Sequence, residues 1–266
     1  MKISDKIRDR ISNVDGQIGI YYYNIKKDNG TFVGNCDVFP SLGIAKFILL
    51  IEVFRQVEDG IISFSDKYVL KKEPPFAIPE SEYEETVGIL DFLHKGIELT
   101  IEDLVYLMMV ISDNSAFNIL LSIVGIDNIN STMTKLGLVH TKIRCMLFEW
   151  DDRNPEKDNY HSVREVGNLL KRLYNKQLIS IEASEKMMKL LSYHQRREFL
   201  SFFSNRKITV AQQTGFDTKS LHDVAVIMSK NPFIICMSVN NVNAKKAEEI
   251  FEDIALMCYQ DSTEQL

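Results

Sequence analysis

Strand-forming runs at the two ends of the chain constrain its fold most. Residues 17–24 and 31–35 are rich in β-formers, and the turn signal Lys27-Asp28-Asn29-Gly30 joins them as a hairpin. Three further strand-forming runs follow near the other end, at 208–212, 224–228 and 233–239. The sequence therefore predicts an α+β fold in which one antiparallel sheet is built from both ends of the chain.

Helical periodicity fills the middle of the chain and also marks its two ends. Apolar residues recur at helical spacing over 3–14, 44–57, 104–111, 116–124, 126–136, 162–174, 181–192 and 243–259. Thr100 and Asp103 predict a capping box where one of these helices begins. We expect a single domain with a sheet lobe (1–38 plus 205–266) that is flanked by the terminal helices, and an inserted all-helical lobe (39–204). A cleft between two such lobes is the expected place for a ligand.

Composition excludes several classes of protein. The 266 residues carry a net charge of −6 and no run of Lys and Arg, which argues against non-specific nucleic-acid binding. None of the four cysteines forms a CxxC unit, so we expect no metal, and Cys236 and Cys258 lie in apolar runs that predict buried thiols. We also expect no cofactor and a monomer.

No apolar run approaches the roughly 20 residues that a membrane-spanning helix needs. The first residues lack the apolar core of a signal peptide. We therefore expect a cytoplasmic protein, or a secreted one if a signal peptide has been removed.

The stretch from Phe39 to Lys46, here called the elbow, runs as a short loop into the apolar helix 44–57. Lys46 lies one turn inside that helix, among apolar neighbours. A lysine in such surroundings costs free energy unless it has partners or a function. The alternative is a lysine that extends its head group to solvent from the helix face.

Three motifs occur in an order that resembles the class A β-lactamase and penicillin-recognising serine hydrolase family. The elbow ends in Lys46, the second motif is Ser112-Asp113-Asn114, and the third is Gln213-Thr214-Gly215. That family carries a Ser-x-x-Lys elbow, a Ser-Asp-Asn loop and a Lys-Thr-Gly strand. The resemblance covers roughly residues 15–258, and it implies the serine β-lactamase-like fold and acyl transfer on β-lactams or D-Ala peptides.

Two departures from the family pattern affect the chemistry that the resemblance implies. Gly43 stands three residues before Lys46, where the family has its nucleophilic serine, so covalent catalysis by the family's route is not available. Ser41 lies two residues earlier and is not expected to replace it. Gln213 stands where the family has the lysine of Lys-Thr-Gly, so the attraction to a substrate carboxylate is weaker.

The stretch 141–160 corresponds to the family's omega loop, which holds a deacylating glutamate. Alignment from Thr141 puts Leu147 at that position, with Glu149 nearby as a possible substitute or a solvated carboxylate. Cys145 and Asn159 stand where the family has an arginine and its aspartate partner, and losing both avoids an unpaired charge.

The remaining motif residues keep the types that the family uses. Ser112 would shuttle a proton or only cap the next helix, and Asn114 would contact a substrate amide and Lys46 or only fix the loop. Asp113 is expected to bond backbone amides, and His222 to be a satisfied strand histidine. Thr214 and Gly215 would form the strand edge where a substrate docks. The backbone N–H groups of Gly43 and Phe216 correspond to the family's oxyanion hole.

The sequence therefore predicts a β-lactamase-like homologue that is impaired or inactive in acylation. Gly43 is either an engineered serine-to-glycine change or the mark of a natural degenerate member, and the off-pattern Gln213 and Leu147 favour the second. The alternative is a non-catalytic module that binds or senses a β-lactam or a peptidoglycan-like peptide. A third reading is a structural protein with a vestigial cleft.

Overall fold

The computed structural model describes residues 1–71, 88–147, 157–195, 200, 203 and 207–263. Its helices are α1 Ile3–Ile11, α2 Ala45–Glu58, α3 Ile101–Val110, α4 Asn114–Val124, α5 Ile126–Lys135, α6 Val163–Tyr174, α7 Ile181–Ser192 and α9 Ala244–Thr263, with short 3-10 turns η1 Leu42–Ile44 and η3 Leu90–Phe92. Its strands are β1 Gln17–Asn24, β2 Asn29–Gly34, β3 Val38–Pro40, β4 Lys67–Val69, β5 Glu98–Thr100, β6 Tyr160–Ser162, β7 Thr209–Phe216, β8 Ser220–Met228 and β9 Phe233–Asn240.

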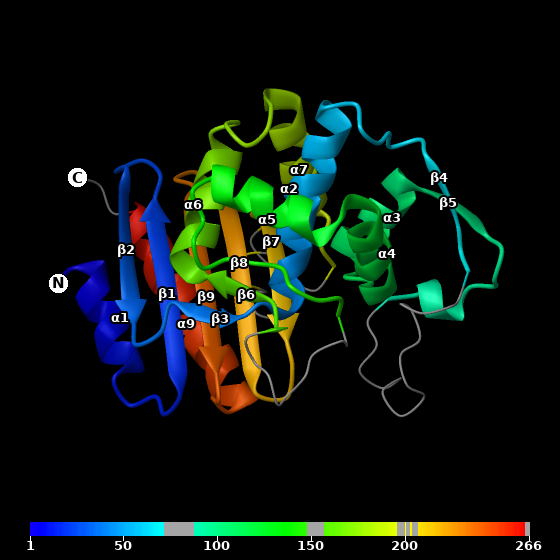
Figure 1. Ribbon diagram of the computed structural model, residues 1–266. Coiled ribbons are helices and arrows are strands. Elements are labelled where there is room, and N and C mark those ends of the chain that lie inside the picture. The colour runs from blue at the N-terminus through cyan, green and yellow to red at the C-terminus, as the bar shows by residue number, and fades with distance from the viewer. Residues whose placement is uncertain (72–87, 148–156, 196–199, 201–202, 204–206, 264–266) are drawn as a thin grey trace.

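The main sheet combines strands from both ends of the chain, as the sequence predicts. Its order is β2-β1-β9-β8-β7, and each neighbouring pair is antiparallel (Figure 1). β3 pairs with β6, and β4 pairs with β5, in two small sheets outside it. The α+β class is thus confirmed, while the boundaries of the two lobes stay a prediction.

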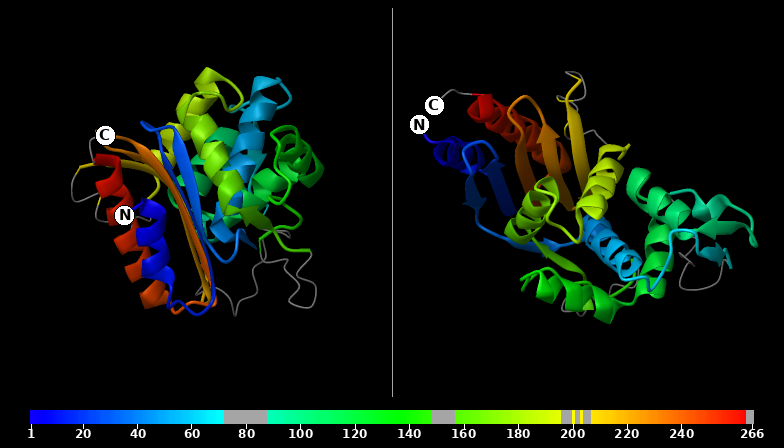
Figure 2. Two further views of the ribbon diagram at one scale, coloured as in Figure 1. Left: turned by 90° about the vertical axis from the view of Figure 1, so that its left-hand side faces the viewer. Right: turned by 90° about the horizontal axis from the view of Figure 1, so that it is seen from above.

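Helices cover both faces of the main sheet. α1 and α9 lie side by side on one face, and the helices from the middle of the chain lie on the other (Figure 2). Each layer has its own apolar core: one joins α1, α9 and the outer sheet face, and the other joins the inner sheet face to α2, α4 and α6. α2 is buried on all sides from Ala45 to Phe54, which identifies it as the central helix of the second core.

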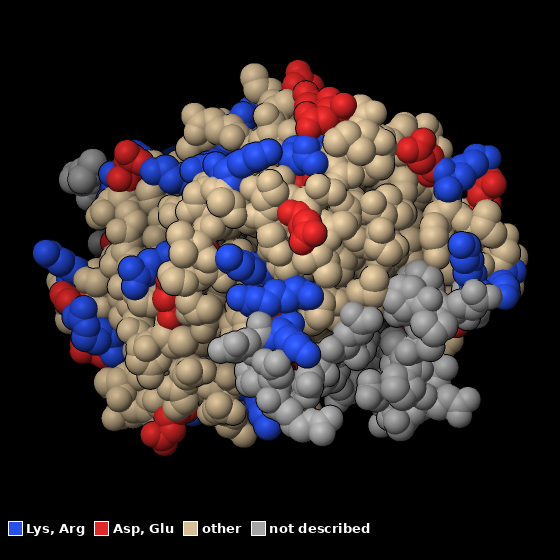
Figure 3. All heavy atoms as spheres, viewed as in Figure 1, with Lys and Arg blue, Asp and Glu red and all other residues tan. Residues whose placement is uncertain are grey.

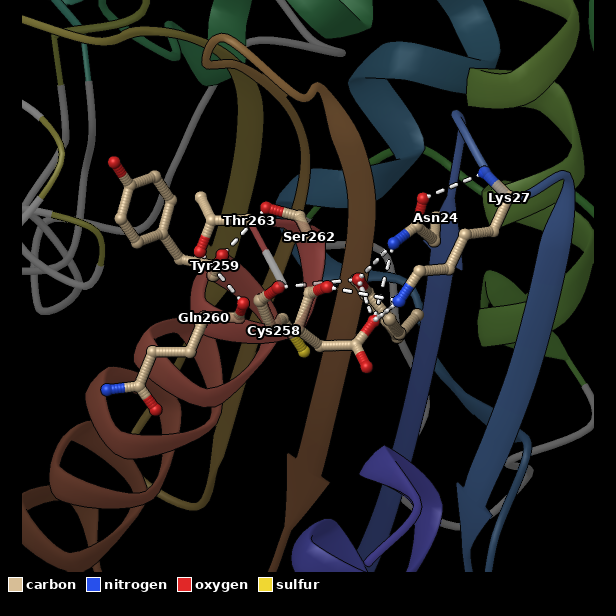
Figure 4. A network of polar contacts seen from close by, with 9 residues as sticks. Asn24, Lys27, Cys258, Tyr259, Gln260, Ser262 and Thr263 are labelled. Atoms are coloured by element: carbon tan, nitrogen blue, oxygen red, sulfur yellow. Dashed lines mark hydrogen bonds and ion pairs between the residues drawn. The ribbon is translucent and has the colours of Figure 1, made fainter. Parts of the chain in front are cut away.

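Polar contacts fasten the last turn of α9 to the sheet. The Tyr22 hydroxyl donates to the Asp261 carboxylate at 2.9 Å, and the Asn24 amide reaches the same oxygen at 3.3 Å. Lys27 donates to the backbone carbonyl of Asp261 at 3.3 Å (Figure 4). These contacts hold the C-terminal helix against β1.

Several predicted helix ends agree with the structure. α7 spans the predicted residues, and the capping box of α3 is present, with the Thr100 hydroxyl accepting from the Asp103 N–H at 3.1 Å.

No helix among the described residues is long and apolar enough to cross a membrane.

Candidate active site

The elbow is held in place from both sides. The elbow begins in β3, which pairs with β6. Next to that pairing, the Ser41 N–H donates to the Asn159 carbonyl at 2.7 Å. Leu42 adopts a φ of +44°, a backbone conformation that residues other than glycine rarely take. Strain of this kind persists only where the surrounding structure fixes it, and it is common at functional sites.

Gly43 packs directly against strand β7. A Cβ placed on Gly43 would lie 2.1 Å from the Thr214 carbonyl oxygen and 3.0 Å from the Cα of Gly215. A Cβ on Gly215 would in turn lie 2.6 Å from the Gly43 nitrogen. Both obstacles are backbone atoms, so neither contact can be relieved by a side-chain rotation. The elbow and the strand therefore fit together only because both residues are glycine.

Lys46 is buried and bonded to the second motif. Its side chain is 2 % exposed, and its Nζ donates to the Asn114 Oδ1 at 2.7 Å. Ser112 lies two residues before Asn114, is 5 % exposed and has a φ of +61°. The sequence alternative of a lysine head group in solvent is therefore wrong, and the first two motifs lie together.

Asp113 fixes the loop between α3 and α4. One carboxylate oxygen accepts from the Ala116 N–H at 2.9 Å as the N-cap of α4. The other accepts from the N–H groups of Ile89 and Leu90 at 2.6 and 3.0 Å. Asp113 is thus structural, as expected, and its bonds set the positions of Ser112 and Asn114 on either side.

The third motif lies on the edge strand β7. The buried Gln213 side chain donates from Nε2 to the Thr214 carbonyl at 3.1 Å, and its Oε1 has no hydrogen-bond partner among the described residues. The Thr214 hydroxyl lies 3.0 Å from the His194 Nε2, and the His194 Nδ1 lies 2.8 Å from the Met109 carbonyl. Phe216 ends the strand with its side chain 42 % exposed.

His194 is a site residue that sequence reasoning missed. It follows α7, 20 residues before Thr214 and outside all three motifs, and is fully buried between α3 and β7. Because a carbonyl can only accept, the His194 Nδ1 must donate to Met109. No local pattern marks this residue, since only the packing of α7 on β7 brings it to Thr214.

Two buried histidines lie beneath the elbow. The rings of His161 on β6 and His222 on β8 have centroids 5.1 Å apart, with Phe39 packed against both. The His161 Nε2 lies 2.9 Å from the Ser238 hydroxyl. Burial lowers the pKa of His222 to about 4, and burial together with the neighbouring His222 lowers the pKa of His161 well below its usual range. Both rings are therefore neutral at pH 7.

The described part of the loop 141–160 is fixed by two asparagines. Asn118 on α4 exchanges two hydrogen bonds with the backbone of Leu147, at 2.9 and 3.2 Å. The Asn159 side chain accepts from the Cys145 N–H at 3.1 Å and donates to the Cys145 carbonyl at 3.0 Å. Neutral contacts thus replace the ion pair that the family resemblance implies at Cys145 and Asn159. Glu149 lies outside the described residues.

The structure gives no support to Ser41 as a nucleophile. Ser41 is fully buried, and its hydroxyl has no hydrogen-bond partner among the described residues. The motif residues that do come together are Gly43 with Thr214 and Gly215, and Lys46 with Asn114. No group of three or more His, Cys, Asp or Glu side chains that could hold a metal occurs within the described ranges.

Comparisons with known proteins agree with this geometry. The profile of the beta-lactamase enzyme family matches residues 2–261. Beta-lactamase VEB-1 of Pseudomonas aeruginosa is 24 % identical over 274 residues, which cover 94 % of this chain and 87 % of VEB-1. The beta-lactamase of Sphaerobacter thermophilus superposes with a TM-score of 0.86 at 23 % identity, covering 98 % of this chain and 96 % of that one.

PBP-A superposes with a TM-score of 0.85 at 21 % identity, covering 97 % of this chain and 95 % of that one. The family profile spans nearly the whole chain, from the first helix to the last turn of α9. On this ground the protein belongs to the beta-lactamase enzyme family, and it has the fold of the class A-like serine enzymes.

Proposed function

We propose that this chain is a β-lactamase-like serine hydrolase homologue in which acylation is impaired or absent. The observation that carries the proposal is the contact between Gly43 and the Thr214 carbonyl, because a Cβ at position 43 would lie 2.1 Å from that oxygen. A nucleophilic side chain is absent at this position, and the space that one would occupy is filled by backbone. Acyl transfer needs a nucleophile within reach of the substrate carbonyl.

The close fit also bears on the origin of Gly43. A serine replaced by glycine in an otherwise unchanged site would leave a gap the size of the lost side chain. Here the strand backbone fills that volume, and Gly215 makes the matching approach from the other side. The fit therefore favours a natural glycine over an engineered change, in line with the off-pattern Gln213 and Leu147.

A hydrolysis assay tests the proposal. A chromogenic cephalosporin is incubated with the chain, and we expect no turnover above that of a buffer blank. Turnover that disappears in a Lys46→Ala variant would contradict the proposal, because it would assign activity to this site.

A second candidate, a non-catalytic module that binds a β-lactam or a peptidoglycan-like peptide, is favoured by the buried Lys46–Asn114 bond. Burying a cation costs free energy that its partners must offset, so a buried lysine in a core indicates a use for its charge. A relative, PBP-A, has been solved in mutant form as an acyl-enzyme complex with penicillin G, which supports this ligand class. Fluorescence anisotropy with a labelled penicillin measures reversible binding, which this function requires. An Asn114→Leu variant should bind the labelled penicillin more weakly.

A further inference from the structure

Four cations lie along α5, α6 and the segment after α5, and two of them, Lys142 and Arg144, follow the chain that pairs with the elbow. They are Lys135 at the end of α5, Lys142 and Arg144 in the segment that follows, and Arg172 on α6. Figure 3 shows Lys and Arg side chains gathered over α5, α6 and the chain between them, with few acidic side chains among them. We call these four residues the basic face.

Contacts between the segments make this face continuous. The Glu165 carboxylate on α6 accepts from the N–H groups of Val139 and Thr141, both at 2.7 Å, which holds the segment after α5 along α6. The Arg144 guanidinium lies over the Tyr160 ring and donates to the Asp158 carbonyl at 2.9 Å. The backbone donors that hold Glu165 are neutral, so its carboxylate keeps its negative charge and offsets part of the positive charge of the basic face.

The cations of the basic face differ from their neighbours in having no ion pair with a described acidic residue. Lys171 pairs with Asp28 at 3.1 Å, and Lys176 is paired with Glu185. Within the described ranges, by contrast, no ion pair joins Lys135, Lys142, Arg144 or Arg172 to a carboxylate. In a chain of net charge −6, such a concentration of positive charge, unpaired as far as the described residues go, favours a polyanionic partner.

A hollow of about 370 Å³ opens in this face. Its lining includes two cations, Arg172 and Lys171, one carboxylate, Glu165, and the amide side chains of Asn168, Asn175 and Gln177. Amides offer donors and acceptors to sugar hydroxyls, while a guanidinium pairs with carboxylate, sulfate or phosphate. The volume lies within the usual range for small-ligand sites, roughly 300–1,000 Å³.

Other polyanions fit this face less well. Binding of single-stranded nucleic acid uses exposed aromatic rings for base stacking, and the described part of the face exposes none, because the Tyr160 ring lies under Arg144. Insertion into a membrane surface uses exposed apolar anchors, and Val139 is the one strongly exposed large apolar residue along these segments as described. We propose that the basic face docks an anionic polysaccharide, with an acidic sugar unit in the hollow beside Arg172.

The test uses a heparin oligosaccharide as the probe and isothermal titration at low salt with the full chain. A Lys135→Glu/Lys142→Glu/Arg172→Glu variant should lose at least about tenfold in affinity, because ionic contacts to a polyanion dominate binding at low salt. The matched control is Lys219→Glu/Lys230→Glu/Lys245→Glu, which changes the net charge equally on exposed positions elsewhere. We expect it to bind within about twofold of the original chain, which is what contacts confined to the basic face predict.

Three results would overturn the proposal: no binding of the probe, equal losses in the two variants, or equally tight binding of single-stranded DNA or anionic vesicles at the same salt. Should the triple variant fail to fold, Arg172→Gln alone must still weaken the binding. None of these measurements involves a penicillin, so their outcome does not depend on whether the proposed function of the elbow site is correct.

Discussion

Gly43 determines how closely the elbow packs against β7. It lacks the positive φ that would by itself require glycine, so the demand for glycine is steric and comes from the Thr214 carbonyl. The motif order locates Gly43 in the sequence, but its contact with β7 could not be predicted there. That contact joins two segments from opposite ends of the chain, and no local pattern encodes how closely they approach.

Replacing Gly43 with serine should destabilise the protein without creating an active site. The strand or the elbow must move to admit a Cβ, and forced repacking of this kind costs about 1–3 kcal/mol. The midpoint of thermal unfolding should therefore fall by several degrees.

Gly30→Ala is the matched control for this substitution. Gly30 also lacks a positive φ, but the atoms nearest to an added Cβ belong to the side chains of Tyr21 and Tyr23, which can move. An unchanged midpoint for Gly43→Ser, or an equal loss in both variants, would mean that the elbow has room for a side chain.

The buried Lys46–Asn114 pair predicts a measurable coupling. Hydrogen bonds to a charged group contribute about 1.5–3 kcal/mol, and removing one partner leaves the other buried without it. Asn114→Leu should therefore lower the free energy of unfolding more in the original chain than in a Lys46→Met background.

Urea unfolding of the four variants of this double-mutant cycle gives the coupling directly. Additive effects of the two substitutions would contradict the pairing of Lys46 with Asn114.

At the scale of elements, the packing of β3 and β6 on β8 introduces an acid sensitivity. The His161 and His222 rings lie in that interface, and burial lowers the pKa of both. An unfolded chain binds protons at the ordinary histidine pKa of about 6.5, so it binds more protons than the native state below that pH. The free energy of unfolding should therefore fall as the pH drops from about 6.5 towards 4, by about 3 kcal/mol for His222 alone.

Unfolding by urea between pH 7 and pH 4 measures this slope. His222→Gln should flatten the profile, because the glutamine does not titrate, whereas His140→Gln on an exposed position should leave it unchanged. Parallel profiles for the original chain and His222→Gln would contradict the assignment.

Element boundaries were predictable where short-range signals fix them. The α3 capping box and the extent of α7 follow from local sequence. β7, by contrast, continues to Phe216, beyond the predicted end at 212, because Thr214 and Gly215 pair with Asp223 and His222 of β8. Pairing across strands overrides the polar character of that segment.

At the scale of the whole molecule, motif order and the distribution of strands predict the fold, while the distribution of charge does not follow from the sequence. The basic residues never form a run, so the sequence argues against non-specific nucleic-acid binding and gives no sign of a basic face. The fold nevertheless gathers four of them along α5 and α6. The net charge adds up all ionised groups and does not show where on the surface they lie, so it does not reveal such a face.

We propose that the elbow of this family member cannot be acylated. The most direct test is the intact mass of the full chain after incubation with excess penicillin G, with an active serine β-lactamase of the family treated in parallel. We predict an unchanged mass, because position 43 has no hydroxyl and the Thr214 carbonyl occupies the space beside it. A mass increase equal to one penicillin, mapped to Ser41 or Ser112, would contradict the claim.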